Sequence, residues 1–85
     1  MIVKIFTKDD DTINFLKENI KYYAIKGDII DTFGEDYKPK NKLIILYNIN
    51  SIDYQIANKT IKLYYQNISI NIKIDNIDDL FIEKQ

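Results

Sequence analysis

The chain has 85 residues, a formal net charge of −1, and neither cysteine nor histidine. These values exclude disulfides and thiol chemistry, leave out the most common general base, and give no strong electrostatic attraction to nucleic acid or to an anionic membrane. A chain of this length predicts a single domain over residues 1–85, which buries roughly 60–65% of its unfolded surface around one core.

The first predicted element is a strand over residues 2–7. Val3 and Ile5 alternate with Ile2 and Phe6, so both faces of this strand carry apolar side chains. Strands that are apolar on both faces are buried on both sides. We therefore expect this strand to lie inside the sheet or under a helix.

A helix is predicted next, and it begins at the acidic run 9–12 and ends near Gly27. Carboxylates at a helix start bind free backbone N–H groups and oppose the positive end of the helix dipole. Glycine is favoured just past a helix end. The apolar stripe at helical spacing is Ile13, Leu16, Ile20, Tyr23 and Ala24. A short strand is expected over residues 28–33.

The second half predicts a four-stranded β-meander over about residues 42–75, with two-residue turns at 50–51, 58–59 and 66–67. In this register Leu63 faces Ile70, Tyr54 faces Leu63, and Ile49 faces Ile52. Because a slip of one residue would turn every apolar side chain of a strand to water, the agreement of the three turns supports the assignment. A short C-terminal turn or helix follows, with residues 80–82 as an apolar plug.

These elements predict an α+β fold. One main helix packs on a mostly antiparallel sheet, in the order β-α-β followed by the four-stranded meander. The acidic run 9–11 is interpreted as a helix start, because three consecutive residues diverge and do not converge on a cation. Asp75, Asp78 and Asp79 are interpreted as turn and cap residues. We expect no metal site and no cofactor. Two glycines are too few for a glycine-rich phosphate loop. No enzymatic activity is predicted.

The expected function is binding of another protein. Phe15 and Tyr22 are seven residues apart on the predicted helix, opposite its core stripe, with Glu18 and Asn19 between them. Ile44 and Leu46 lie on the otherwise polar face of the meander, where they are either covered by the C-terminal plug or exposed as a second patch. The predicted protein-contact residues are Phe15, Glu18, Asn19, Tyr22, Ile44 and Leu46.

Two alternatives remain open. Lys62, Tyr64, Asn71 and Lys73 share the second face of the predicted meander, and aromatic rings with lysines are typical of single-strand nucleic-acid binders. The slightly acidic chain disfavours nucleic acid as a partner. The other alternative is a structural subunit that self-associates, for example as a homodimer.

The origin and compartment are inferred from composition. Ile, Lys, Asn and Tyr make up 47 of the 85 residues, and all four have A/T-rich codons. This bias favours a phage, virus or mobile element of an A/T-rich genome, and thus an inhibitor or adaptor, for example an inhibitor of a host defence system. The longest apolar run, residues 43–47, is too short to span a bilayer. The first residues lack the pattern of a signal peptide. A cytoplasmic location, in the protein's own cell or in a host, is expected.

Overall fold

The computed structural model describes residues 1–26 and 42–84. Over these residues it shows one α-helix and seven strands in two antiparallel sheets, which confirms the predicted α+β class with a β-meander. The helix is α1 (Asp10–Asn19). The four-stranded sheet has the order β2 (Tyr23–Lys26), β3 (Lys42–Leu46), β1 (Ile2–Thr7), β7 (Asp79–Glu83). The three-stranded sheet is β4 (Ser51–Gln55), β5 (Thr60–Tyr65), β6 (Ile68–Lys73), with short 3-10 turns η1 (Ile56–Asn58) and η2 (Ile74–Asn76).

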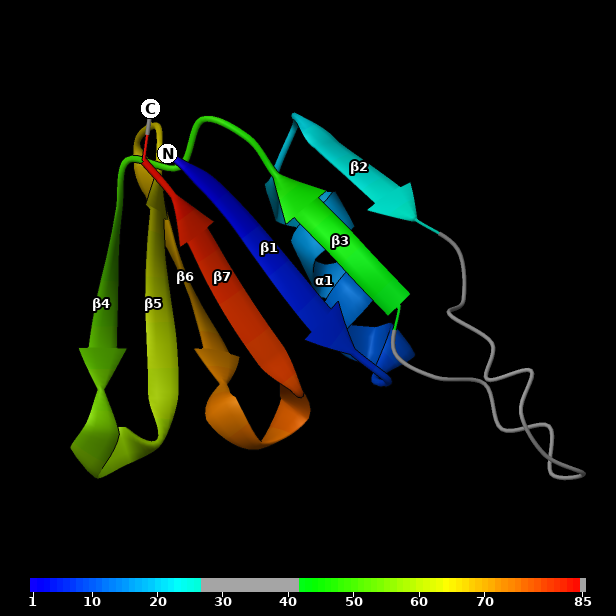
Figure 1. The fold of residues 1–85 in the computed structure, drawn as a ribbon. Coiled ribbons are helices and arrows are strands. Elements are labelled where there is room, and N and C mark those ends of the chain that lie inside the picture. The colour runs from blue at the N-terminus through cyan, green and yellow to red at the C-terminus, as the bar shows by residue number, and fades with distance from the viewer. Residues whose placement is uncertain (27–41, 85) are drawn as a thin grey trace, which may run out of the picture.

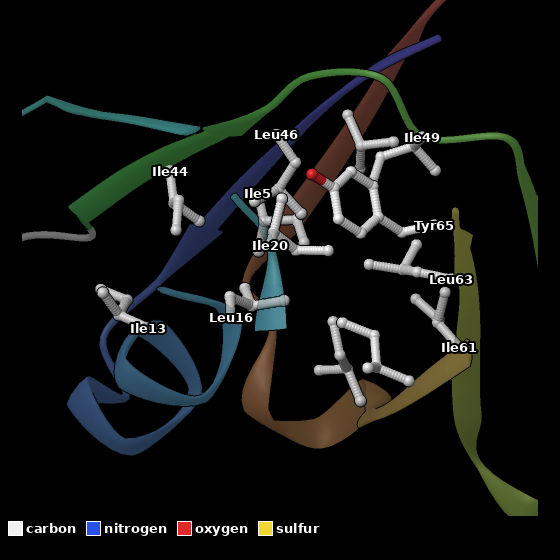
Figure 2. Packing of buried hydrophobic residues seen from close by; sticks show 13 residues of the cluster. Ile5, Ile13, Leu16, Ile20, Ile44, Leu46, Ile49, Ile61, Leu63 and Tyr65 are labelled. Atoms are coloured by element: carbon white, nitrogen blue, oxygen red, sulfur yellow. The ribbon is translucent and has the colours of Figure 1, made fainter. Parts of the chain in front are cut away.

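Both α1 and the three-stranded sheet pack on the same side of the four-stranded sheet. In Figure 1, α1 lies behind β1 and β3, and β6 passes behind β7. Figure 2 shows the result: Leu16 from α1 and Leu63 from β5 point toward each other beneath Ile5 of β1. One continuous core therefore joins all three parts. Its buried residues are Val3, Ile5, Ile13, Leu16, Ile20, Ile44, Leu46, Ile49, Ile61, Leu63, Tyr65, Ile70 and Ile72.

β1 is the central strand of the fold. It pairs with β3 on one side and with β7 on the other, so the predicted interior strand over residues 2–7 is confirmed. Val3, Ile5 and Thr7 face the core and are fully buried, whereas Ile2 and Phe6 face the other way and are half-buried. The two faces of β1 thus have different surroundings, and only one of them carries the core.

The predicted end of the helix near Gly27 is wrong. The helix ends at Asn19, and Ile20 already has an extended backbone with φ of −108° and ψ of 121°. The following residues form β2, where aromatic and β-branched side chains suit a strand. Tyr47 N donates to Tyr22 O at 2.9 Å, so the ladder with β3 begins before β2 itself. Pairing with a distant strand overrides the local helical spacing. The strand expected at residues 28–33 lies outside the described residues.

The meander has three strands, not the predicted four. β3 pairs with β1 and β2 in the other sheet, so Ile49 does not face Ile52. Ile49 is instead fixed beside the N-terminus: Ile49 N donates to Met1 O at 3.1 Å, and Met1 N donates to Ile49 O at 2.8 Å. The chain therefore crosses from one sheet to the other at residues 47–50 instead of turning back in a hairpin.

The two remaining predicted turns have different outcomes. The turn at 66–67 is confirmed, with Leu63 opposite Ile70 and Lys62 opposite Asn71. The turn at 58–59 is longer than predicted, because η1 occupies residues 56–58 and Lys59 follows with φ of 53°. Tyr54 consequently pairs with Ile61 instead of Leu63. A shift of two residues keeps each side chain on its predicted face, but it removes Ile56, which is 81% exposed, from the ladder.

The prediction of a short C-terminal turn or helix with an apolar plug is also wrong. Residues 79–83 form β7, antiparallel to β1, and not a short turn or helix. Within β7, Leu80 packs against the core, whereas Phe81 faces the other side of the sheet. A strand buries alternate side chains here, so residues 80–82 do not act as a single apolar unit.

Candidate protein-contact surface

The side of the four-stranded sheet opposite the core is the most distinctive surface of the described chain. In β1 the side chains at 2, 4 and 6 point away from the core, because successive side chains of a strand point to opposite faces. Residues that pair with these positions, directly or through β3, point to the same side of the sheet, and they come from β2, β3 and β7. We call this surface the outer face. Its strand residues are Ile2, Lys4, Phe6, Ala24, Lys26, Leu43, Ile45, Asp79, Phe81 and Glu83.

The ladders arrange the outer face in rows that run across the strands. The first row, in sheet order, is Lys26, Leu43, Phe6 and Asp79. The second row is Ala24, Ile45, Lys4 and Phe81. The backbone bond between Tyr47 and Tyr22 continues the register, so the two tyrosines extend the row of Ile2 and Glu83 across β3 and β2.

The outer face carries a group of apolar side chains, with Lys4 between Ile45 and Phe81 in the second row. Ile45 is only 8% exposed, yet it does not belong to the core cluster. Phe6 and Phe81 meet edge to face, with ring centroids 5.9 Å apart and an interplanar angle of 83°. Phe81 nevertheless remains 52% exposed. An aromatic and aliphatic group of this kind on a sheet face is typical of an interaction surface.

The charges of the outer face lie toward its edges. Lys26 and Asp79 occupy opposite ends of the first row, on β2 and β7. Lys4 is nearer the centre, but its Nζ lies 2.5 Å from Oε1 of Glu83, which draws the ammonium toward the β7 edge. An apolar centre with a polar rim is the usual composition of a protein interface.

None of the described helices or strands covers the outer face. Figure 1 looks directly onto it, and β2, β3, β1 and β7 lie in front with α1 behind them. An apolar sheet face is normally covered by a second layer. Among the described elements, that layer is present on one side of the sheet only.

The structure separates the predicted contact residues of the helix. Phe15 is 39% exposed on α1, but Tyr22 lies beyond the end of the helix and extends the outer face. Glu18 is exposed, and Asn19 is half-buried with its Nδ2 donating to Phe15 O at 2.8 Å. The geometric reason for grouping Phe15 with Tyr22 is therefore wrong, because it required a helix that continues through residue 22.

Ile44 and Leu46 are not an exposed patch. Both are fully buried core residues, on the side of β3 that faces α1 (Figure 2). The prediction placed them on a polar face because it paired β3 with β4. In the four-stranded sheet both side chains point to the core side, and Ile45 between them points to the outer face. No partner can contact Ile44 or Leu46 in the folded protein.

The four residues of the nucleic-acid alternative do share one face. Lys62 is opposite Asn71 in the ladder, and its Nζ lies 5.6 Å from the centre of the Tyr64 ring. Lys73 is opposite Thr60, two positions along the same face. On the other neighbouring strand, Asp53 is opposite Lys62 and offsets part of its charge.

A shallow groove of about 270 Å³ lies between the start of α1 and β6. Phe15 and Ile72 give it an apolar part, and Asp9, Asp11 and Lys73 give it charges of both signs. The carboxylate of Asp9 already accepts a hydrogen bond from the Thr12 hydroxyl at 2.6 Å. In the part of the chain that the structure describes, no three acidic side chains converge to hold a metal ion.

Sequence reasoning missed most of the outer face. The sequence did contain a signal: the strands at residues 2–6 and 43–46 carry apolar side chains on both faces. One helix covers only one side of a sheet, so the second apolar face needs another contact. No protein-family model matches the chain, and no curated protein or solved structure is significantly similar to it. Within residues 1–26 and 42–84, no helix is both long and apolar enough to cross a membrane.

Proposed function

We propose that this protein is a non-enzymatic protein-binding module that acts through the outer face of its four-stranded sheet. The observation that carries this proposal is the apolar group of Phe6, Ile45 and Phe81 on a sheet face that no described element covers, with the Phe81 ring 52% exposed. Covering such a surface removes apolar area from water, which is the main driving force of association.

The chemistry of the face fits a protein better than the other classes of partner. Its charges include both signs, with Lys4 and Lys26 against Asp79 and Glu83. A nucleic acid or an anionic lipid surface selects clustered positive charge. Phe81 is exposed on this face, and aromatic side chains are among those that contribute most to protein–protein affinity.

The whole chain supports binding over catalysis. Without histidine and cysteine it lacks the side chains that most often act as base and nucleophile near neutral pH. An inhibitor or adaptor needs only a surface. The bias toward residues with A/T-rich codons supports a phage, viral or mobile-element origin, and with it a place of action in the cytoplasm of a cell.

A photo-crosslinking residue at position 81 tests the proposal. Tyr54 is a matched control, because it is also an aromatic residue of a strand and is also 52% exposed, but it lies on the other sheet. We expect a protein adduct from position 81, either in the purified protein or in a lysate of the producing cell, and none from position 54. Equal labelling at both positions, or no adduct at position 81, contradicts the proposal.

A second candidate function is binding of single-stranded nucleic acid by the outer side of the three-stranded sheet. The observation that favours it is the gathering of Lys62, Tyr64, Asn71 and Lys73 on that side. Fluorescence anisotropy with a labelled oligothymidine at low salt tests it. Binding that weakens steeply with salt and is lost in Tyr64→Ser supports this function. No change in anisotropy rejects it.

A further inference from the structure

We infer that the partner of the outer face is a second copy of this chain, packed face to face about a two-fold axis that runs parallel to the strands between β3 and β1. This inference rests on the proposed function, because it concerns the same surface. β3 and β1 are the two middle strands of the order β2–β3–β1–β7, so this axis passes through the centre of the sheet. Closed two-fold interfaces are the commonest arrangement of identical chains, and they require a surface that complements itself.

The charges of the first row complement themselves under this axis. The rotation reverses the strand order across each row and leaves the position along the strands unchanged. Lys26 of one copy therefore lies over Asp79 of the second copy, and Asp79 over Lys26. Each dimer contains this ion pair twice, once at each edge of the interface. The backbone N–H of Leu80 donates to Asp79 Oδ1 at 2.9 Å, which fixes that carboxylate at its edge.

The sizes of the side chains are complementary as well. In the first row, Leu43 of one copy lies over Phe6 of the other. In the second row, Ala24 lies over Phe81, so the smallest side chain of the outer face meets one of the largest. Alternation of large and small residues across facing positions allows two sheets to interdigitate. Phe81, exposed in one copy, gains a site over Ala24 on the edge strand β2 of the other.

The central lysine is compatible with this packing. Lys4 lies over Ile45 of the second copy, and its ammonium is held by Glu83 at 2.5 Å. The aliphatic stem of Lys4 can therefore cover Ile45 while the charge stays near the edge. Without the ion pair to Glu83, this position would place an unpaired charge in the middle of the interface.

The other in-plane axis, perpendicular to the strands, is disfavoured by the same register. It would place each strand over its own counterpart, so that Asp79 and Glu83 on β7 would face the acidic residues of the second β7. Like charges opposed across an interface weaken association and exclude wrong arrangements. The charge pattern therefore selects the axis along the strands.

The expected dimer is weak. Four strands about 4.8 Å apart, with about 3.3 Å per residue, give a face of roughly 19 by 17 Å. That is roughly 320 Å² on each copy, below the size of most specific interfaces, so a contact that dissociates readily is expected. The measurement must therefore cover protein concentrations from about 10 μM to about 1 mM.

Sedimentation equilibrium of the wild type and of two charge reversals tests the inference. Lys26→Asp and Asp79→Lys change exposed side chains, so both variants are expected to fold. Each variant alone opposes like charges at both edges, and its dimer affinity should fall by about tenfold.

A mixture of the two variants restores both ion pairs. In the mixed dimer, the aspartate introduced at position 26 of one chain faces the lysine introduced at position 79 of the other, and the unchanged Asp79 faces the unchanged Lys26. The mixture should associate as tightly as the wild type.

The outcomes separate this inference from the function on which it rests. Recovery of association in the mixture, and in the double variant Lys26→Asp/Asp79→Lys, supports the dimer. If the dimer affinity is the same in both charge-reversal variants as in the wild type, the inference is overturned, because the two chains then use another surface. A wild type that stays monomeric at every concentration also overturns it. If position 81 still crosslinks to a different protein in that case, the proposed function stands without the dimer. If position 81 gives no adduct, both fail.

Discussion

At the scale of single residues, Thr7 has a role that its position at the end of β1 does not reveal. The side chain is fully buried, its Oγ1 donates to Asn76 O at 2.5 Å, and it accepts from Asp9 N at 3.0 Å. One hydroxyl thus joins the end of β1 to the start of α1 and to η2. A buried hydroxyl with two backbone partners is costly to remove, because both partners lose their bond away from water.

Replacing Thr7 by Val should reduce the free energy of unfolding by about 1–3 kcal/mol, since Val has the same shape but leaves Asp9 N and Asn76 O unpaired. Thr7→Ser is the matched control, because it keeps the hydroxyl and loses one methyl group. Urea unfolding of both variants gives the comparison. The interpretation is contradicted if Ser destabilises the protein more than Val does.

Leu63 should be among the most sensitive positions of the core. It is fully buried and lies opposite Ile70 and Ile52 in the ladders of the three-stranded sheet. Leu63→Ala should cost roughly 2–5 kcal/mol, as large-to-small substitutions in a core do. Ser69→Ala, at an exposed position of β6, is the control and should change stability by less than about 0.5 kcal/mol. A loss below about 1 kcal/mol for Leu63→Ala would show that the site collapses without a cavity.

At the scale of elements, the sequence predicts pairings that are close along the chain and misses those that are distant. The hairpin around residues 66–67 is predicted residue by residue, because two short runs and one turn decide it. The end of α1 is missed, because residues 23–26 become a strand only through β3. β7 is missed for the same reason, since its partner β1 lies at the other end of the sequence. Local spacing contains no information about such partners, and tertiary pairing decides.

The same contrast explains the candidate site. The alternating polar residues of β5 and β6 place Lys62, Tyr64, Asn71 and Lys73 on one face without knowledge of the rest of the fold. Predicting the outer face requires knowing that β3 lies between β1 and β2. Once β3 is moved from the meander to that sheet, Ile44 and Leu46 become core residues and Ile45 becomes outward-facing. One wrong strand pairing is enough to reverse the interpretation of Ile44 and Leu46.

The turn between β5 and β6 allows a test at this scale. Gln66 has φ of 53°, a left-handed conformation that glycine adopts without steric cost, whereas Asn67 keeps a negative φ. Gln66→Gly should therefore leave stability unchanged or raise it by up to about 1 kcal/mol. Asn67→Gly should lower it by about 0.5 kcal/mol, because there glycine only adds freedom to the unfolded chain. In thermal melts, the Gln66→Gly variant should therefore have a higher Tm than the Asn67→Gly variant. The reverse order would contradict the interpretation.

At the scale of the whole molecule, both sheets contribute buried side chains to one core. The three-stranded sheet buries Ile61, Leu63 and Tyr65 against the same cluster that holds Val3 and Ile5 of β1. No single sheet closes this core, and α1 alone does not cover it. Among the described elements, one face of the four-stranded sheet therefore packs on the core and the other is uncovered, which is the arrangement that the proposed function requires.

A shared core predicts that the two sheets unfold together. Leu63→Ala, a change in β5, should lower the protection of backbone amides in β1 against hydrogen exchange. The loss should match the loss in β5 to within about 0.5 kcal/mol, because the amides of a cooperative unit report one opening reaction. The amides of β1 should also be among the slowest to exchange, since this strand is paired on both sides. If Leu63→Ala lowers protection in β5 and β6 but leaves β1 unchanged, the sheets open independently. The four-stranded sheet and α1 would then hold enough core to stay folded without the meander.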